Sequence, residues 1–165
     1  MDRCKVGVIG CGDISRVYLH SLTQVFRNTQ VVAVSSRGGE SARRRAAEFD
    51  IPYAVSTEEL LAMEFDIVVI LTDPVSHFRL AEQALLAGKH TYVEKPLAAT
   101  TAEAAHLLTL AREKNLMLTC APDTLLGGGI QTCRKLIDNG LIGTPVASVG
   151  QTFNGGPEAW HPNPF

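Results

Sequence analysis

Lys5-Val6-Gly7-Val8-Ile9-Gly10-Cys11-Gly12-Asp13-Ile14-Ser15 is the stretch that decides the fold of this 165-residue chain. Residues 5–9 form an apolar run typical of a β-strand, and the pattern that follows predicts a helix over about residues 14–25. Between them lies a glycine-rich turn. Strand, glycine turn and helix in this order are the context in which a dinucleotide-binding fingerprint is meaningful.

The turn itself predicts a site for the phosphates of a nucleotide. Gly10 allows a tight turn, and Gly12 lets the backbone approach a pyrophosphate. Ser15 stands in the place of a third glycine and is still small enough for close helix–strand packing. Backbone N–H groups around Asp13 and Ile14 would face an anion. The alternative is a turn selected for packing alone, and the Asp13 side chain suits a helix cap better than a ligand.

Strand and helix patterns continue to alternate along the chain. Further strands are expected over residues 31–35, 66–71, 90–95, 116–120 and 146–153. Further helices are expected over residues 41–49, 56–63, 76–87, 100–114 and 130–139, with capping boxes at Ser56 and Thr100, a cap at Ser76 and stops at Gly88 and Gly140. This alternation predicts an α/β fold, a doubly wound parallel (Rossmann) sheet with helices on both faces.

Composition limits the class of protein. A formal charge of −2 provides no overall basic field for nucleic acid or an anionic membrane, and no apolar run approaches the length of a membrane span. The N-terminus does not read as a signal peptide. The four cysteines lack paired metal-ligand spacing, so we predict no metal site and a reducing, cytoplasmic location.

Ser36 and Arg37 follow the second expected strand, where enzymes that prefer NAD place an acid for the ribose 2′-hydroxyl. Ser36 can donate a hydrogen bond to a 2′-phosphate, and Arg37 can pair with it. We therefore predict NADP, with NAD possible as an alternative cofactor. Residues 43–45 are all arginine and add positive potential, although at least two of them are expected to form an ordinary solvated helix face.

Two more strand ends carry candidate site residues. Thr72, Asp73 and Pro74 follow one strand and should border the cleft, with His77 either touching the cofactor or fixing the loop. Taken alone, His77 reads as a capping or packing histidine. The next strand ends in Glu94-Lys95-Pro96, where Lys95 is a candidate proton-transfer group or, alternatively, a surface lysine.

The order of these motifs resembles the Gfo/Idh/MocA oxidoreductases (glucose–fructose oxidoreductase, inositol dehydrogenase and relatives) over about residues 6–153. Ala87-Gly88-Lys89-His90 with Glu94-Lys95-Pro96 is the most specific part. The resemblance implies that Lys95 lies beside the nicotinamide and assists proton transfer at a sugar or polyol hydroxyl, that Glu94 positions it and borders the nicotinamide ribose, and that the Lys95–Pro96 bond is cis. It also implies a homo-oligomer at full length.

The chain departs from the family pattern after the sixth strand, where Cys120-Ala121-Pro122-Asp123 replaces the usual Asn and Arg. Asp123 could contact substrate or cap the following helix. We expect residues 1–122 to form the dinucleotide-binding domain. Residues 123–165 are then a connecting helix and the first strand, at about residues 145–153, of a truncated α+β substrate domain.

These boundaries predict a fragment that binds cofactor with little or no turnover. Trp160 and His161 could approach the nicotinamide in an intact enzyme, but in this chain we expect them to lie on a mobile tail. Two other functions remain open at this point. The chain could be a non-enzymatic NADP-binding regulatory module, because fold alone does not fix function. It could also be an interaction domain that keeps a Rossmann core.

Overall fold

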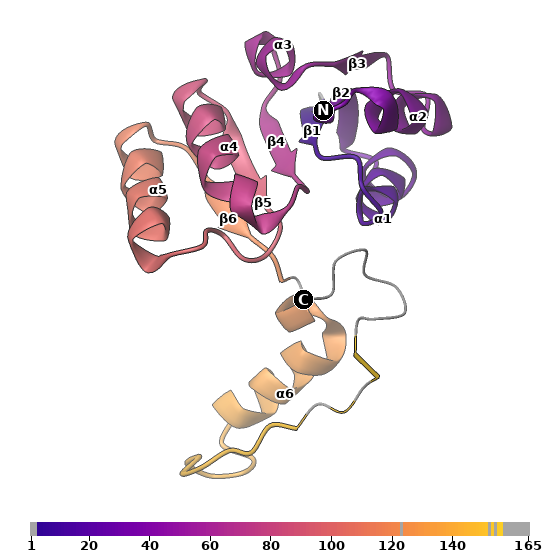
Figure 1. The fold of residues 1–165 in the computed structure, drawn as a ribbon. Coiled ribbons are helices and arrows are strands. Elements are labelled where there is room, and N and C mark those ends of the chain that lie inside the picture. The colour runs from indigo at the N-terminus through magenta and orange to yellow at the C-terminus, as the bar shows by residue number, and fades with distance from the viewer. Residues whose placement is uncertain (1–2, 123, 152, 154, 157–165) are drawn as a thin grey trace. The chain divides into compact units, whose positions relative to one another are not determined.

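In the computed structural model, which describes residues 3–122, 124–151, 153, 155 and 156, the chain divides into two compact units, Met1–Pro122 and Asp123–Phe165. The first unit is built on a six-stranded sheet in the order β3-β2-β1-β4-β5-β6 (Figure 1). Every pair of neighbouring strands is parallel. The strands are β1 (Cys4–Ile9), β2 (Thr29–Ser35), β3 (Tyr53–Val55), β4 (Ile67–Ile70), β5 (His90–Val93) and β6 (Leu118–Cys120). This order is that of a Rossmann sheet, so the predicted fold is confirmed.

Helices cover both faces of the sheet. Their bounds are α1 (Ser15–His20), which continues as a π-helical turn at Ser21–Val25, α2 (Glu40–Glu48), α3 (Thr57–Ala62), α4 (Pro74–Leu86) and α5 (Thr101–Glu113). Leu19 of α1 and Ala42 of α2 join one core cluster on one face, whereas Leu60, Leu85 and Leu107 of the other three helices join the second cluster. The doubly wound arrangement follows from these two cores.

Strand β1 contributes to both cores through the alternation of its side chains. Val6 and Val8 belong to one core cluster, and Ile9 belongs to the other. Gly7 faces Leu60 and Phe65 so closely that a Cβ atom would lie 2.9 Å from each side chain. The glycine therefore lets α3 and the segment before β4 pack directly on the sheet.

The predicted helix starts are correct at some positions and wrong at others. Ser56 and Thr100 both form complete capping boxes, as expected. The expected cap at Ser76 is wrong, because α4 begins two residues earlier at Pro74, with Asp73 in the N-cap position. Proline is favoured at a first helical position since its fixed φ suits the helix and it has no N–H group to leave unpaired.

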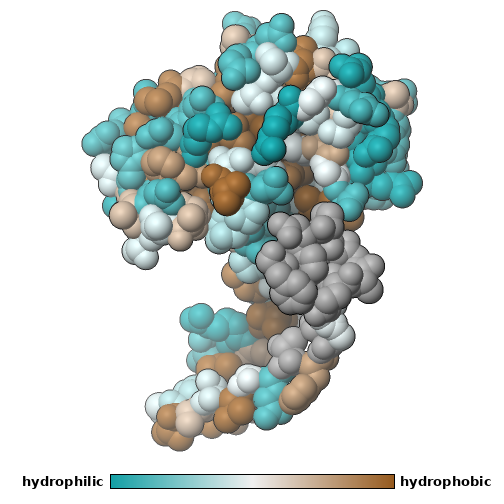
Figure 2. All heavy atoms as spheres, viewed as in Figure 1, coloured by the Kyte–Doolittle hydropathy of each residue, from teal (hydrophilic) through white to brown (hydrophobic). Residues whose placement is uncertain are grey.

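The second unit contains a 3₁₀ turn, Thr124–Leu126, and one longer helix, α6 (Gly128–Asp138). All of its described residues are exposed, among them the apolar Ile130, Leu141 and Val146. Figure 2 shows apolar surface on this unit. The strand expected over residues 146–153 is wrong for the described residues 146–151 and 153, because no described segment pairs with them. A strand needs a partner for its backbone hydrogen bonds. Asp123, Trp160 and His161 lie outside the described residues.

Within the part of the chain that the structure describes, no helix is both long and apolar enough to cross a membrane.

Candidate functional site: the edge where β2, β1, β4 and β5 end

The residues predicted to bind a cofactor gather at one edge of the sheet. Strands β2, β1, β4 and β5 are neighbours and parallel, so their carboxyl ends lie side by side. The chain leaves β1 towards β2 on one side, while β4 lies on the other side of β1. This reversal of strand order is the point at which open α/β sheets bind dinucleotides.

Gly10 and Gly12 meet different requirements in the turn after β1. Gly10 has φ +102°, and a Cβ atom there would lie 2.6 Å from the backbone carbon of Leu71, so only glycine fits. At Gly12 a Cβ atom would meet nothing within 4 Å. The backbone N–H groups of residues 11–14 donate to no acceptor among the described residues. The turn thus offers free donors beside open space, which fits a phosphate ligand.

Asp13 does not cap helix α1. The N-cap position is occupied by Ile14, and no side chain accepts a hydrogen bond there. Arg16 donates its backbone N–H to the carbonyl of Asp13 rather than to its carboxylate. The expected cap is therefore wrong, because Asp13 lies one residue too early, and its exposed carboxylate borders the turn.

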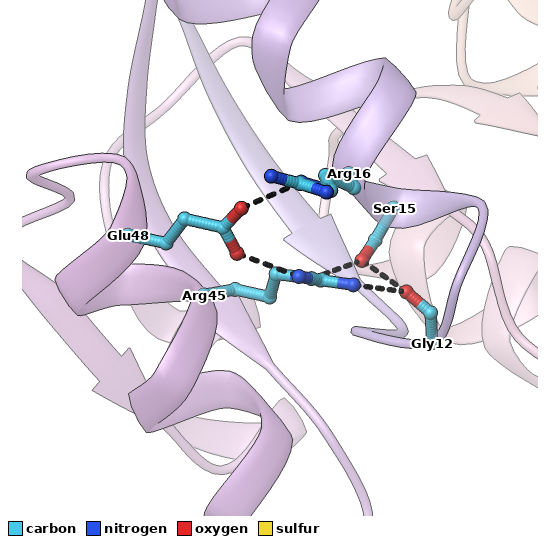
Figure 3. Close-up of polar contacts among 5 residues, drawn as sticks. All are labelled: Gly12, Ser15, Arg16, Arg45 and Glu48. Carbon is cyan, nitrogen blue, oxygen red and sulfur yellow. Dashed lines mark hydrogen bonds and ion pairs between the residues drawn. The ribbon is translucent and has the colours of Figure 1, made fainter.

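Arg45 of α2 contacts the glycine turn after β1 (Figure 3), and this contact was not predicted from the sequence. Its Nε donates to Ser15 Oγ at 3.1 Å, its Nη2 donates to the Gly12 carbonyl at 3.2 Å, and its Nη1 pairs with Glu48 at 2.6 Å. Arg43 and Arg44 are exposed, as expected for two of the three arginines. The missed signal was the spacing of Ala42 and Arg45, which puts both on the buried face of α2.

Cys11 is buried within the same turn. Its thiol donates to the Ser35 carbonyl, with the sulfur 3.4 Å from the oxygen, and the backbone N–H of Gly10 donates to the same carbonyl at 2.9 Å. Burial raises the pKa of the Cys11 thiol to about 11, and the nearby charge of Arg45 only partly opposes this rise. The thiol is therefore a neutral donor that joins the end of β1 to the end of β2.

Ser36 and Arg37 lie at the end of β2. Ser36 Oγ accepts a hydrogen bond from the backbone N–H of Ala42 at 3.1 Å, which leaves its hydroxyl proton free to donate. Arg37 is exposed, and its Nη2 lies 3.9 Å from the carboxylate of Asp73, which follows the end of β4. The pair therefore spans the turn that separates these two strand ends.

Glu94 and Lys95 follow β5. One carboxylate oxygen of Glu94 accepts from the Tyr18 hydroxyl at 2.8 Å, and the other accepts from the backbone N–H of Lys95 at 2.8 Å. The peptide bond from Lys95 to Pro96 is cis, as expected. The Lys95 side chain is exposed, and its ammonium forms no ion pair with any residue that the structure describes.

His77 supports the same strand end from the opposite face of the sheet. The residue is fully buried in α4, with Nδ1 2.6 Å from the Pro96 carbonyl and Nε2 2.9 Å from the Thr72 carbonyl. Both ring nitrogens are thereby engaged by the protein. Of the two roles considered for His77, the geometry fits loop fixing rather than direct contact with a cofactor.

Comparison with known proteins agrees with this arrangement. A family model described as an oxidoreductase family with an NAD-binding Rossmann fold (Gfo/Idh/MocA) matches residues 4–121. A dTDP-3,4-didehydro-2,6-dideoxy-α-D-glucose 3-reductase of Streptomyces violaceoruber is 36% identical over 140 residues, which cover 84% of this chain and 41% of the reductase. An inositol 2-dehydrogenase of Klebsiella pneumoniae is 31% identical over 147 residues, which cover 86% of this chain and 43% of that enzyme.

A solved structure also matches at the level of sequence and fold. A 3-ketoreductase mutant from Actinomadura kijaniata, in complex with TDP-benzene and NADP, has a TM-score of 0.77 and 32% identity to this chain. The match covers 86% of this chain and 46% of the ketoreductase. The chain thus spans less than half the length of each of these three proteins.

Proposed function

This chain belongs to the Gfo/Idh/MocA oxidoreductase family, and from that premise we propose that it forms the NADP(H)-binding part of an enzyme that transfers a hydride between nicotinamide and a sugar or polyol carbon. The observation that carries the proposal is the position of Lys95. It follows β5, two strands along from the glycine turn, and it is held at its backbone by Glu94 and, through Pro96, by His77. A lysine at this edge of the sheet would lie close to a substrate hydroxyl beside the nicotinamide, and it could accept the proton of that hydroxyl.

The cofactor site would use residues from all four strand ends. Gly10, Gly12, Asp13 and Ile14 would surround the pyrophosphate, an assignment that the free N–H groups and the open space at Gly12 support. Ser36 and Arg37 would bind the adenosine ribose and its 2′-phosphate. The remaining contacts would come from Thr72, Asp73, Pro74, Glu94, Lys95 and Pro96, with His77 holding two of these segments in place.

The chemistry divides between the cofactor and Lys95. Bound nicotinamide supplies the hydride acceptor or donor. During oxidation, the neutral Lys95 amine would take the hydroxyl proton as the substrate carbon loses its hydride, and during reduction the ammonium would return that proton. Glu94 would act on orientation, since its carboxylate fixes the backbone at Lys95 and is itself held by Tyr18.

NADP is the preferred cofactor in this proposal. The ketoreductase complex with NADP supports it at the level of the family, and the exposed Arg37 guanidinium with the free Ser36 hydroxyl proton supports it in this chain. A sugar or polyol substrate is supported by the names of the reductase and the inositol dehydrogenase. The contribution of Asp123 to substrate binding stays a proposal from sequence.

Two experiments test the proposal. Titration of the chain with NADPH and NADH, followed by nicotinamide fluorescence, should give saturable binding that is tighter for NADPH. In the protein that carries this chain, Lys95→Met should abolish most NADP-dependent turnover of sugars or polyols while the dissociation constant of NADPH changes by less than about threefold. Lys114→Met, which changes an exposed lysine elsewhere in the first unit, is the matched control.

Each experiment has an outcome that contradicts its part of the proposal. Absence of binding by either dinucleotide would remove the cofactor assignment. Unchanged turnover in Lys95→Met would remove Lys95 from the mechanism. Binding without turnover of any sugar or polyol by the protein that carries this chain would favour a regulatory NADP-binding module instead.

We also propose a cytoplasmic location and a homo-oligomeric state for the protein. The location is supported by the four cysteines, none of which forms a disulfide among the described residues. The oligomeric state rests on family resemblance alone, and sedimentation analysis would test it.

A further inference from the structure

We propose that Arg45 is a positioning residue for the phosphate-binding turn, because it holds the Gly12 carbonyl towards α2 and so keeps the N–H groups of the turn available to the ligand. The inference rests on the proposed function, since the ligand of the turn is taken to be the pyrophosphate of NADP(H). Arg45 would not itself touch the cofactor. It would act through the backbone of residues 12 and 13.

Side chains from α2 and α1 both donate to one atom of the turn, the carbonyl oxygen of Gly12. The Gly12 carbonyl oxygen accepts hydrogen bonds from Arg45 Nη2 at 3.2 Å, from Ser15 Oγ at 2.5 Å and from the Ser15 backbone N–H at 3.3 Å. Ser15 Oγ in turn accepts from Arg45 Nε at 3.1 Å. Figure 3 shows the guanidinium facing both Ser15 and Gly12. One planar group therefore fixes the carbonyl both directly and through the serine.

The direction of this carbonyl determines what the turn presents to an anion. In a trans peptide the C=O of Gly12 and the N–H of Asp13 point in opposite directions. Holding the oxygen against Arg45 therefore points the Asp13 N–H away from Arg45, and that N–H donates to no described residue. If the peptide turned over, the oxygen would face the phosphate, where two partial negative charges would repel each other.

A counter-charge keeps the guanidinium in place. Arg45 is only 8% exposed, and its Nη1 pairs with Glu48 Oε2 at 2.6 Å. The other Glu48 oxygen accepts from Arg16 Nε at 2.8 Å. These hydrogen bonds, first of all the one from Arg45, hold the pKa of the Glu48 carboxyl below its ordinary value, so Glu48 is ionised at neutral pH. All three guanidinium nitrogens are thus engaged, an arrangement that the single ammonium of lysine cannot reproduce.

Stability alone is a poor explanation for a buried charge at this position. Arg45 is buried but its partner Glu48 is exposed, and an ion pair that is open to solvent on one side contributes little net stability. The neighbouring Arg43 and Arg44 are exposed, so the arginine run does not itself require burial. What distinguishes position 45 is its direct contact with the turn that would bind phosphate.

The test compares two ligands that share adenosine but differ at the turn. ADP-ribose contains the pyrophosphate, whereas adenosine 2′-monophosphate reaches only the Ser36 and Arg37 end of the site. In the 165-residue chain, Arg45→Met should weaken binding of ADP-ribose by about tenfold or more, the equivalent of one or two lost hydrogen bonds. Binding of adenosine 2′-monophosphate should change by less than about twofold, and Arg45→Lys should give an intermediate loss for ADP-ribose.

Two further measurements separate positioning from general loosening. Arg44→Met, which neutralises the exposed neighbour on the same helix, should leave both affinities unchanged. In the ligand-free protein, Arg45→Met should shift the amide NMR resonances of Gly12 and Asp13, while the resonance of a remote core residue such as Leu85 stays in place. Equal weakening of both ligands would show a merely structural role and overturn the inference.

Failure of the inference can be told from failure of the proposed function. If the unsubstituted chain binds neither NADPH nor ADP-ribose, the proposed function is wrong. If it binds both, and Arg45→Met binds ADP-ribose equally well, only the inference is wrong. Should Arg45→Met not fold, as judged by circular dichroism, Arg45→Lys takes its place, because a single ammonium cannot reproduce the three contacts of the guanidinium; unchanged ADP-ribose affinity in Arg45→Lys also overturns the inference.

Discussion

The hydroxyl of Tyr18 donates a hydrogen bond to Glu94 Oε1 at 2.8 Å, although the two residues are 76 positions apart in the chain. Tyr18 belongs to α1, which follows the glycine turn, and Glu94 precedes Lys95. Burial is the main reason that the pKa of Tyr18 is raised well above its ordinary value, and hydrogen bonds with Tyr92 and Glu94 raise it further. The hydroxyl therefore stays protonated at neutral pH and links the phosphate end of the site to the strand end that carries Lys95.

Tyr18→Phe should weaken this link without creating a cavity. We expect the free energy of unfolding to fall by about 1.5–3 kcal/mol, the range for a hydrogen bond to a charged partner. Binding of NADPH should weaken as well, since the Glu94-Lys95 backbone loses one anchor. Urea denaturation and fluorescence titration measure the two effects. Tyr53→Phe, at an exposed tyrosine of β3, is the control, and equal behaviour of the two variants would show that the Tyr18 hydroxyl contributes nothing.

Substitutions of the two glycines in the turn should have opposite consequences. Gly10→Ala places a Cβ atom on the Leu71 backbone at a left-handed φ, so it should lower the free energy of unfolding by more than about 2 kcal/mol. Gly12→Ala meets no protein atom and should fold normally, yet bind ADP-ribose at least about tenfold more weakly because the methyl group occupies ligand space. Thermal unfolding and calorimetry test the pair. Full ADP-ribose affinity in Gly12→Ala would argue that the space at Gly12 is not the ligand site.

Arg37 should determine the preference for NADPH, and Asp73 should oppose it. Arg37→Ala should weaken the binding of NADPH by about tenfold and change the binding of NADH little, since only NADPH has the 2′-phosphate. Asp73→Asn should strengthen the binding of NADPH, because it frees Arg37 from its ion pair with Asp73. The expected gain is about two- to fivefold, since an exposed ion pair 3.9 Å apart contributes at most about 1 kcal/mol. Both effects should shrink at high salt. Arg43→Ala is the matched control, and an equal effect of Arg37→Ala on NADH would contradict this role.

Glu48 should contribute to stability in a pH-dependent way. Its folded-state pKa lies below the ordinary value of 4.5, chiefly because Arg45 donates to it. The contribution is therefore fully present above about pH 4.5 and is lost as the pH falls through the lower folded-state pKa. Urea denaturation should show Glu48→Gln less stable than the unsubstituted chain at pH 7, with the difference fading in acid. The exposed Glu113→Gln is the control, and a difference that persists at pH 2–3 would contradict the ionic origin.

Much of the first unit was predictable because local patterns and the core agree. The capping boxes at Ser56 and Thr100 and the apolar strands that lie between helices define the order of elements, and right-handed crossovers leave few topologies to consider. The short edge strand β3 was missed because it has only three residues and pairs on one side with β2. The strand expected near residue 146 failed for a related reason, since pairing depends on a partner that periodicity does not reveal.

The site was predictable as a set of strand ends but not as a set of contacts. Gly10, Ser36 and Glu94 are recognisable by motif and by position after a strand. The contacts of Tyr18 with Glu94, and of Arg45 with Gly12, join elements that are distant in sequence, and each reads locally as an ordinary helix residue. Only the packing of α1 and α2 on the sheet brings them to the site. The placement of His77 against the Pro96 and Thr72 carbonyls depends on the same kind of long-range packing.

The buried thiol of Cys11 has a consequence for chemical labelling. With its pKa near 11, Cys11 holds almost no thiolate at neutral pH, and the turn covers it. Cys133 is exposed in the second unit, so alkylating reagents should modify it first and leave Cys11 intact while the turn stays closed. The rate at which Cys11 becomes reactive then reports how often the glycine turn opens, and a ligand bound there should slow that rate.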